Sequence, residues 1–370
     1  MHPALLPLLR CPVGGGPLEL RTIRPAVAAE GASVETGILY SPQSRHWYPV
    51  INHIPVLLTF RTALADGFQR THASELASLD GYHLPDEAPM PGERSVQATF
   101  TEEWAALGDD DQTFVYTDSE LESLHRDVWL RMTGPERQAV RTVLNVGVGF
   151  GKETRVLASL FPNAMTIGVD LNLALIGAGA ILARVPRTHA VIASLFRMPF
   201  EAGTFDHVHS QGVIHHTYST KAAFDAIQRF VAARGSLFVW VYAAEDSHVV
   251  PGFRGFLVWL YWVTTHRIFR PILSRSPALV RNGAMYAIAG VLHPVLKRRN
   301  RRPGQWQFAN TLHGLYDAFT PRYAHQHGFN EVIEWFEDAG LLPHLHSPAT
   351  YRRLMGTRLL GVGVIGRRGG

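Results

Sequence analysis

Cysteine is almost absent from this chain of 370 residues, in which Cys11 is the single one. One cysteine excludes a disulfide within the chain and is typical of a protein that works in a reducing compartment. Long hydrophobic runs are missing too, since no stretch reaches the ~18–20 apolar residues of a membrane-spanning helix. The stretches that come nearest, 256–265 and 283–292, are short and are flanked by arginine or histidine. We therefore predict no transmembrane segment.

Charged residues are also scarce, at 18% of the sequence compared with about a quarter in an average protein. This shortage indicates that part of the surface is apolar. The formal net charge is +4, the sequence pI is near 9.3 and histidine occurs nineteen times. Such a mild basic balance is compatible with an anionic acceptor but does not require one. No basic region precedes the apolar residues of segment 1–12, so we predict no signal peptide and expect a soluble, cytoplasmic protein.

A glycine-rich turn between a strand and a helix lies at the centre of the chain. The apolar run 143–146 is short and β-branched, as a buried parallel strand is. Gly147, Gly149 and Gly151 follow it at alternating positions. Glycine allows a strand to turn sharply into a helix while its backbone passes close to a ligand. The pattern therefore predicts a ligand-binding loop.

The residues after the glycines complete a strand–helix–strand unit. A helix is predicted over 152–161, and a second buried strand, 165–169, ends in Asp170. An acidic residue at this place can accept hydrogen bonds from both hydroxyls of a ribose. The unit alone fits dinucleotide-binding enzymes and enzymes that use S-adenosylmethionine (SAM), so it leaves the cofactor open.

Three later blocks distinguish these cofactors. They lie at 191–200, 204–217 and 235–242 and have the sequences VIASLFRMPF, TFDHVHSQGVIHHT and GSLFVWVY. In this order they resemble the successive blocks of a class I SAM-dependent methyltransferase of the type 11 group, over about 95–342. The resemblance implies an α/β, Rossmann-like, doubly wound fold with a mostly parallel seven-stranded sheet. A dehydrogenase fits less well, because its glycine pattern and later blocks differ.

The resemblance also assigns residues to the cofactor SAM. It implies that the glycine loop carries the methionine part, that Asp170 binds the ribose, and that Leu171 and Asn172 flank the adenine. Asn145 and Ser194 stand where the family has acidic residues, and these departures weaken the expected SAM contacts without affecting the fold. The predicted cofactor-binding set is Asn145, Gly147, Gly149, Gly151, Asp170, Leu171, Asn172, Ser194, Leu195 and Ser210.

Candidate catalytic residues come from the end of the fourth strand and from a later loop that resembles one closing over the active site in this subgroup. The predicted set is His215, His216, Tyr323, His325 and His327. In an extended chain His215 and His216 point to opposite sides, so at most one faces the acceptor. A histidine is a suitable general base near neutral pH, and the alternative for each is a structural histidine. Without a carboxylate cluster, we predict no metal.

A separate β-rich module precedes the core. It resembles the zinc-ribbon domain of the small activator subunit of tRNA methyltransferases, where two Cys-x-x-Cys pairs hold zinc. Here Cys11 remains, but Gly14, Ser41 and Ser44 stand where the other three thiolates belong. A structural zinc site needs about four ligands, so we predict that this module binds none.

A small module without metal has to be held by its apolar side chains and by docking on the large domain. The residues predicted to hold it are Leu5, Leu9, Leu18, Leu39, Trp47, Tyr48, Ile54 and Leu57. His46 and His53 are alternative zinc ligands, but we favour surface histidines at both positions.

The predicted domains are the module at 1–60, a linker at 61–94, a SAM-binding core at 95–250, a helical cap insertion at 251–314, and a lid loop with the end of the core at 315–370. Phe100 and Trp104 either form the buried stripe of a helix or lie over the cofactor. The segment 109–111 is predicted as a turn. A helix with Asn330 as N-cap and a final strand at 358–365, followed by a frayed tail, end the chain.

The cap sequence is apolar and aromatic and ends in a basic run, 297–302. This run is predicted as a solvated loop, with anionic lipid, phosphate or RNA as alternative contacts, and the cap is compatible with peripheral membrane contact.

The leading hypothesis is a SAM-dependent methyltransferase that modifies a small-molecule or lipid-like metabolite in biosynthesis. The alternatives are an RNA methyltransferase and a non-catalytic partner protein. The acceptor, the methylated atom and the oligomeric state remain open.

Overall fold

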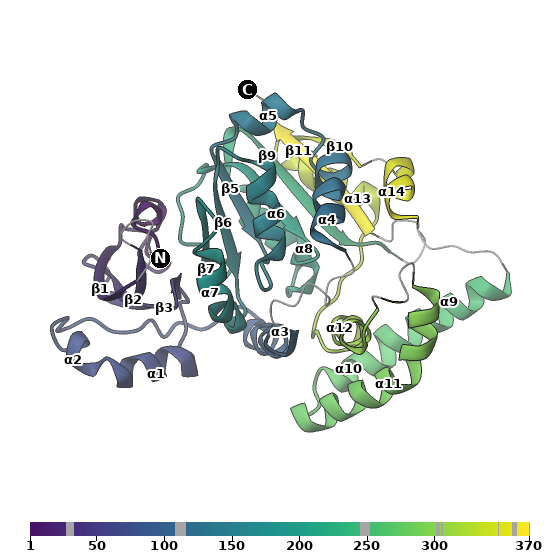
Figure 1. Cartoon of the computed structure of the whole chain (residues 1–370), viewed down its shortest axis with the longest axis horizontal. Coiled ribbons are helices and arrows are strands. Elements are labelled where there is room, and N and C mark those ends of the chain that lie inside the picture. Colours follow the sequence, from purple (N-terminus) through teal and green to yellow (C-terminus); the bar gives the residue numbers. More distant parts are fainter. Residues whose placement is uncertain are drawn as a thin grey trace.

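Two sheets and their covering helices make up the protein (Figure 1). The computed structural model describes residues 1–26, 33–107, 116–244, 252–300, 304, 306–346, 348–356 and 361–369. A small antiparallel sheet lies at the N-terminal end, a seven-stranded sheet forms the centre, and a group of helices projects from the other side. The predicted α/β architecture, with its β-rich module and helical insertion, is confirmed.

The N-terminal module is an antiparallel sheet in the order β1-β2-β3-β4. Its elements are the 3₁₀-helix η1 (Pro3–Leu8) and the strands β1 (Glu19–Pro25), β2 (Val34–Ser41), β3 (His46–Ile51) and β4 (Ile54–Pro55). All eight apolar residues predicted to hold the module are buried. The N–H of Leu57 donates to the carbonyl of Ile192 at 2.7 Å, and one apolar cluster continues from the module into the large sheet. The predicted docking is therefore confirmed.

The segment between module and core contains two helices, α1 (Ala63–Thr71) and α2 (Ala73–Leu76). The hydroxyl of Thr62 caps α1 by accepting a hydrogen bond from the N–H of Ala65 at 3.2 Å. Phe68 of α1 packs in a cluster with Ile38 and Trp47 of the module. The segment predicted as a linker is thus largely packed against the module.

The large sheet has the order β10-β11-β9-β8-β5-β6-β7. Its strands are β5 (Thr142–Val146), β6 (Met165–Asp170), β7 (Thr188–Ile192), β8 (Phe205–Gln211), β9 (Val231–Tyr242), β10 (Leu341–Leu345) and β11 (Gly361–Arg368). β11 pairs antiparallel with both neighbours, and the other described pairs are parallel. The order reverses beside β5, which makes the carboxyl ends of β5 and β8 a topological switch point, where such sheets bind ligands.

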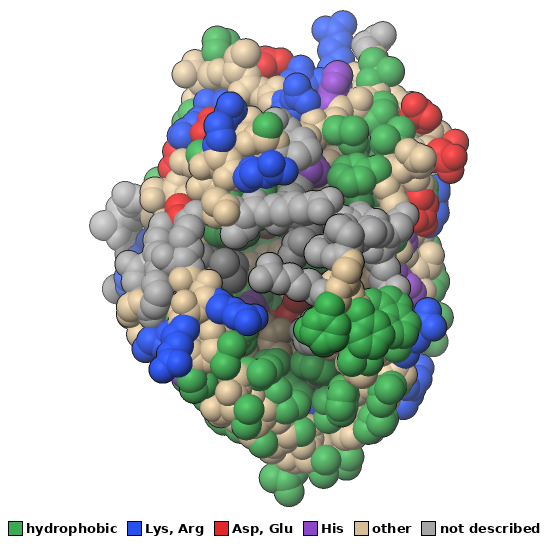
Figure 2. Space-filling view, turned by 90° about the vertical axis from the view of Figure 1, so that its right-hand side faces the viewer, with side chains coloured by type: hydrophobic (Ala, Val, Ile, Leu, Met, Phe, Trp, Pro, Cys, Tyr) green, Lys and Arg blue, Asp and Glu red, His purple; other side chains and the backbone are tan. Residues whose placement is uncertain are grey.

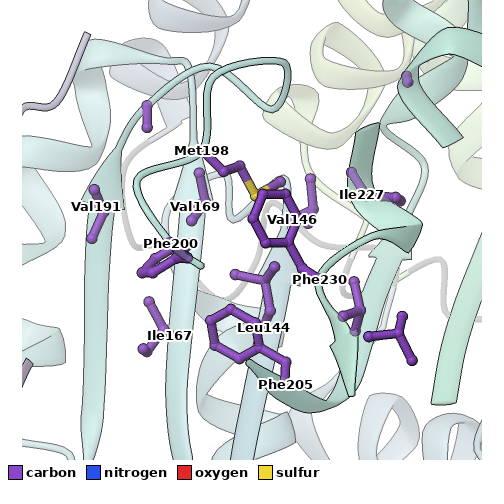
Figure 3. Close-up of a cluster of buried hydrophobic side chains, with 14 of the residues drawn as sticks. Leu144, Val146, Ile167, Val169, Val191, Met198, Phe200, Phe205, Ile227 and Phe230 are labelled. Carbon is purple, nitrogen blue, oxygen red and sulfur yellow. The ribbon is translucent and has the colours of Figure 1, made fainter. Parts of the chain in front are cut away.

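Helices cover both faces of this sheet (Figure 1). They are α3 (Glu93–Leu107), α4 (Asp118–Leu124), the π-helical turn η3 (His125–Trp129), α5 (Gly134–Ala139), α6 (Lys152–Leu160), η4 (Leu173–Ala178), α7 (Gly179–Leu182), η5 (Ile214–His216), α8 (Thr220–Gln228), α13 (Phe329–Asp338) and α14 (Pro348–Met355). Figure 3 shows Leu144, Val146, Ile167 and Val169 of the central strands packing against Phe205 and its neighbours. The predicted helix after the glycines and both predicted strands are confirmed.

The cap consists of α9 (Phe253–Val263), η7 (Thr264–Phe269), α10 (Arg270–Leu273), α11 (Ala278–Arg299) and α12 (Phe308–Phe319). Met285 and Ala289 of α11 pack against Leu315 and Phe319 of α12. Arg281 of α11 pairs with Glu102 of α3, which ties the cap to the core. Within the described residues, none of the helices is both long enough and apolar enough to cross a membrane.

Three local predictions need correction. The N-cap of α13 is Gly328 rather than Asn330, because the N–H of Val332 already bonds to the carbonyl of Gly328. His215 and His216 lie in the 3₁₀ turn η5 and not in an extended strand. β11 continues to Arg368, because residues 366–368 pair with β10, so these residues are no frayed tail. The predicted turn 109–111 and residues 357–360 lie outside the described residues.

Candidate active site

The loop between β5 and α6 requires glycine. Gly147, Gly149 and Gly151 have φ angles of 86°, 58° and 99°, in the left-handed region that side chains rarely adopt. A Cβ atom on Gly147 would lie 2.0 Å from Val213, and one on Gly149 would lie 2.4 Å from Trp104. The loop is therefore packed closely between the end of β8 and α3.

A cavity of about 330 Å³ lies at the carboxyl ends of β5 to β9. α3 and α12 form its opposite wall, with Phe100 and Trp104 among the lining residues. Of the residues predicted for cofactor and catalysis, those that line it are Gly147, Gly149, Asp170, Leu171, Leu195 and His216. The structure therefore brings part of both predicted sets together, and of the two alternatives for Phe100 and Trp104 it favours a segment over the ligand site.

Asp170 ends β6 at the edge of the cavity. Its Oδ2 accepts a hydrogen bond from the N–H of Gly149 at 2.7 Å, and its Oδ1 accepts one from the N–H of Asn172 at 2.9 Å. Burial raises the pKa of this carboxyl above its usual value, against the opposing effect of these backbone hydrogen bonds. Carboxylate oxygens have about four acceptor sites in total, so the acceptor capacity for a diol remains.

Three other predicted cofactor residues lie behind the lining. Asn145 donates from Nδ2 to Oγ1 of Thr154 at 3.0 Å, which fastens β5 to α6. Ser194 accepts a hydrogen bond from the N–H of Phe196 at 3.1 Å. Ser210 is fully buried in β8. Asn145, Ser194 and Ser210 therefore support the strands and loops around the cavity.

Two further members of the predicted set shape the glycine loop. Asn172 donates from Nδ2 to the carbonyl of Gly149 at 3.2 Å, and its Oδ1 caps η4. Gly151 is the N-cap residue of α6. Both residues fix the loop on which the cavity is built.

His216 and Asp317 form a polar pair at the far end of the cavity. Nδ1 of His216 donates a hydrogen bond to the carbonyl of Tyr323 at 2.8 Å, so this nitrogen carries a proton. Nε2 lies 3.5 Å from Oδ1 of Asp317, whose Oδ2 accepts a hydrogen bond from the Tyr242 hydroxyl. Burial raises the pKa of Asp317, but the contacts with His216 and Tyr242 outweigh it and hold that pKa below its usual range. Asp317 is thus an anion that can stabilise positive charge on His216.

A second acid–histidine pair lines the cavity, and the sequence analysis missed it. Glu103 of α3 lies 3.0 Å from Nδ1 of His313 of α12. Burial lowers the pKa of His313, but the hydrogen bond and the charge of Glu103 raise it above its ordinary value. His313 and Asp317 are four residues apart and share one face of α12. That spacing was the available signal, but it does not reveal the partner on α3.

Several lining residues have a buried polar atom that lacks a hydrogen-bond partner within the described chain, among them Oε2 of Glu103, Oε1 of Gln211 and Nε1 of Trp240. Buried polar groups are normally paired, and each unpaired one costs roughly 1–3 kcal/mol. The cavity therefore suits a ligand with both donors and acceptors.

The remaining predicted histidines do not line the cavity within the described residues. His215 is fully buried, and burial lowers its pKa well below the usual value. Nε2 of His325 donates to the carbonyl of Thr217 at 3.0 Å. Nε2 of His327 bonds to the hydroxyl of Thr220 at 2.8 Å. These contacts tie the loop after α12 to the end of β8.

The four positions of the degenerate zinc ribbon do come together. Sγ of Cys11 lies 3.2 Å from Oγ of Ser44 and 3.2 Å from the hydroxyl of Tyr48. The N–H of Ser44 donates to Oγ of Ser41 at 3.3 Å, and the N–H of Gly14 points to the cysteine sulfur at 3.4 Å. One thiol and three hydroxyls do not form the donor set of a structural zinc site. His46 packs against His83 instead.

A buried cluster joins η3, α6 and β8. Oε1 of Glu153 lies 3.0 Å from Nε2 of His125 and 3.5 Å from Nε2 of His209, a spacing that a metal ion can also bridge. Nδ1 of His125 donates to the carbonyl of Leu121 at 2.7 Å. Burial raises the pKa of Glu153, but the two histidines lower it to about 2. The anionic Glu153 is thus held between two histidines, and we interpret the cluster as a buried acid–histidine group.

The sheet order, the glycine loop and the cavity at the strands' carboxyl ends define a fold of the class I methyltransferase type. Two parts of the chain match known families. Residues 144–239 match the family described as methyltransferase domain, and residues 2–52 match the Trm112p-like proteins. The chain therefore carries a methyltransferase domain preceded by a Trm112p-like module, as the sequence resemblance implied.

Individual relatives are distant. The chain is 32% identical over 100 residues to the malonyl-[acyl-carrier protein] O-methyltransferase of Legionella pneumophila, a match that covers 27% of this chain and 35% of that protein. It thus spans about a third of the length of this relative.

Two solved structures are also similar. A complex of the Haloferax volcanii Trm112 methyltransferase activator with a putative methyltransferase has 14% identity and a TM-score of 0.42, over 74% of this chain and 98% of that chain. A putative O-methyltransferase from Nostoc punctiforme has 15% identity and a TM-score of 0.41, over 73% of this chain and 60% of that chain.

Proposed function

We propose that the protein is a SAM-dependent methyltransferase that modifies an O–H or N–H group of a small-molecule or lipid-like acceptor. The observation that carries this proposal is one shared cavity, lined by the glycine loop and Asp170 on one side and by His216 with Asp317 on the other. The first set suits a nucleoside cofactor, and the second suits removal of a proton from an acceptor.

Five residues would hold SAM. Asp170 offers carboxylate oxygens to the ribose hydroxyls, and Leu171 and Leu195 offer apolar contact to the adenine. The backbone of Gly147 and Gly149 would lie beside the methionine part, because both glycines line the cavity. When bound, SAM supplies an electrophilic methyl group on a sulfonium.

His216 acts as the general base in this proposal. Its Nδ1 proton is held by the carbonyl of Tyr323, so Nε2 presents the lone pair that takes the proton of the acceptor. Asp317 then stabilises the imidazolium, and the Tyr242 hydroxyl keeps Asp317 oriented. The acceptor oxygen or nitrogen would gain the methyl group as the bond between that group and the sulfonium breaks, which leaves S-adenosylhomocysteine, while the acceptor's proton would pass to His216. The name of the Legionella relative, which specifies O-methylation, is in line with this assignment.

The two other hypotheses have less support. A decayed, non-catalytic site would not retain three glycines at positive φ and unpaired polar atoms around an open cavity. An RNA methyltransferase is suggested by the degenerate ribbon module and by the basic run 297–302, but this run contains no interleaved aromatic residues on which bases could stack.

Calorimetric titration of SAM and of S-adenosylhomocysteine tests the cofactor part of the proposal. We expect micromolar binding to the full chain and its loss in Asp170→Ala. Asp225→Ala is the matched control, because this exposed carboxylate pairs with Lys221 away from the cavity. Failure of the folded wild-type protein to bind either compound would overturn the proposal.

A further inference from the structure

The cap exposes an unusual amount of apolar surface. Of the nineteen large hydrophobic residues that are exposed in the described chain, sixteen lie between Phe253 and Phe308. Leu279, Val291 and Phe253 are the most exposed of them, at 86%, 75% and 74%. Figure 2, which faces this side of the molecule, shows hydrophobic side chains gathered over its lower part, with lysine and arginine at the margins. Soluble monomers rarely expose contiguous apolar patches of more than a few hundred Å².

The same segment is strongly one-sided in charge. Between Asp246 and Asp317 the sequence contains no acidic residue. It contains ten basic ones, which are Arg254, Arg267, Arg270, Arg275, Arg281, Lys297, Arg298, Arg299, Arg301 and Arg302. Two of these, Arg270 and Arg281, are buried and fasten the cap to α12 and α3. Arg267, Arg275 and residues 297–299 are exposed beside the apolar side chains.

We propose that this surface, the exposed side chains of α9 to α11, docks on an anionic lipid bilayer. Helices that lie in a membrane interface combine large apolar side chains with lysine and arginine, and they bind through both buried apolar area and attraction to anionic lipids. Each cation near such a surface contributes about 1 kcal/mol, which corresponds to roughly a fivefold change in binding. Helices α9 to α11 have both components and contain no acidic residue to oppose them.

Two other occupants fit the surface less well. A second copy of the chain in a twofold dimer would place this cationic patch against itself, with no carboxylate of the patch to pair with. RNA would match the charge, but exposed aliphatic side chains such as Leu279 and Val291 gain nothing in its hydrated grooves. A bilayer accommodates both the charge and the apolar side chains.

Co-flotation of the full chain with vesicles tests the proposal. We expect binding to vesicles of phosphatidylcholine with phosphatidylglycerol, much weaker binding to phosphatidylcholine alone, and weakening by salt. The triple variant Lys297→Glu, Arg298→Glu, Arg299→Glu should lower binding on the order of a hundredfold. Leu279→Ser should lower it about tenfold, because a leucine side chain no longer enters the apolar layer.

Matched controls lie elsewhere on the surface. Leu342 is 65% exposed on β10, and Leu342→Ser should leave vesicle binding unchanged. Arg352→Glu with Arg353→Glu on α14 should likewise have little effect, because both arginines are exposed outside the cap. All variants are compared by thermal unfolding, so that loss of fold is recognised separately.

Three outcomes would overturn the inference. The first is no flotation with anionic vesicles, or flotation that the cap variants do not change. The second is self-association in sedimentation velocity that Leu279→Ser abolishes, which would assign the surface to a second copy. The third is salt-sensitive RNA binding that the charge variant abolishes while vesicles do not bind. None of these outcomes depends on SAM binding, so the proposed function is tested separately.

Discussion

The cavity and the cap are neighbours in this molecule, yet their charged residues differ in sign and in exposure. Around the cavity, carboxylates are paired with histidines, the buried Glu103 with His313 and the half-buried Asp317 with His216. Helices α9 to α11 have no carboxylate, most of their described cations are exposed, and many of their apolar side chains face outward. Because the whole chain carries +4, removing the ten cations of the cap segment leaves a formal charge of −6 on the rest. This difference is what the two proposals require, a cationic cofactor in the cavity and an anionic surface at the cap.

α12 joins these two regions. Its inner face carries His313 and Asp317 to the cavity, and its outer face packs against α11 through Leu315 and Phe319. Arg270 of α10 donates to the carbonyl of Ala318 at 2.8 Å, so a buried cation of the cap closes the end of this helix. One wall of the cavity is therefore built on the cap.

The largest expected effect is on catalysis at the cavity. His216→Asn removes the proposed base and should lower kcat by about 10²–10⁴-fold, the usual contribution of a positioned acid or base. Release of S-adenosylhomocysteine measures it, with an acceptor taken from a screen. SAM affinity should stay within a factor of about three. His344→Asn, at an exposed histidine on β10, is the matched control. Turnover in His216→Asn equal to that of the control would remove His216 from the mechanism.

The second prediction removes a buried carboxylate from the core. Glu153→Gln leaves the histidines His125 and His209 without their carboxylate and should lower the free energy of unfolding by about 3–5 kcal/mol. Denaturant unfolding measures this, and Glu122→Gln, at an exposed pair with Arg126, should cost less than about 0.5 kcal/mol. Chelator should leave the wild-type stability unchanged. A clear loss of stability with chelator would show instead that the cluster binds a metal ion.

His189, at the interface between module and core, should make the stability of the fold depend on pH. Burial, with the nearby His2, lowers the pKa of His189 from 6.5 to about 4. The folded state therefore excludes a proton that the unfolded chain binds. The free energy of unfolding is therefore unaffected by His189 above pH 6.5. It falls as the pH drops from 6.5 toward 4, by up to about 3 kcal/mol. Unfolding of His189→Gln should show a shallower fall over this window than the wild type. Parallel curves would contradict the assignment.

The local patterns predicted the centre of the fold well. An apolar run, alternating glycines and a strand ending in Asp170 are local signals, and the structure places them as β5, the loop and β6. The docking of the module followed from its missing thiolates, because a small sheet without metal needs another surface to bury its apolar residues. Both inferences depend on residues close together in the sequence.

The parts that could not be predicted depend on contacts between distant segments. Glu103 meets His313 across some two hundred positions, and neither residue belongs to a motif. His325 and His327 looked equivalent to His216 in the sequence, but the turn η5 places His216 alone of the three in the cavity lining. The cap helices are apolar nearly all round, so periodicity could not distinguish a buried from an exposed face. The low content of charged residues indicated that part of the surface is apolar, but it did not reveal which part.

The smallest expected effect separates the two faces of the cap itself. Leu279 is exposed on α11, whereas Leu315 lies in the cluster between α11 and α12. Leu279→Ala should therefore change the free energy of unfolding by less than about 0.5 kcal/mol, while Leu315→Ala should cost about 2–5 kcal/mol through its cavity. Both are measured by denaturant unfolding without lipid. A loss above about 1.5 kcal/mol for Leu279→Ala would mean that this face is covered in solution, because truncating a side chain in water removes no packing.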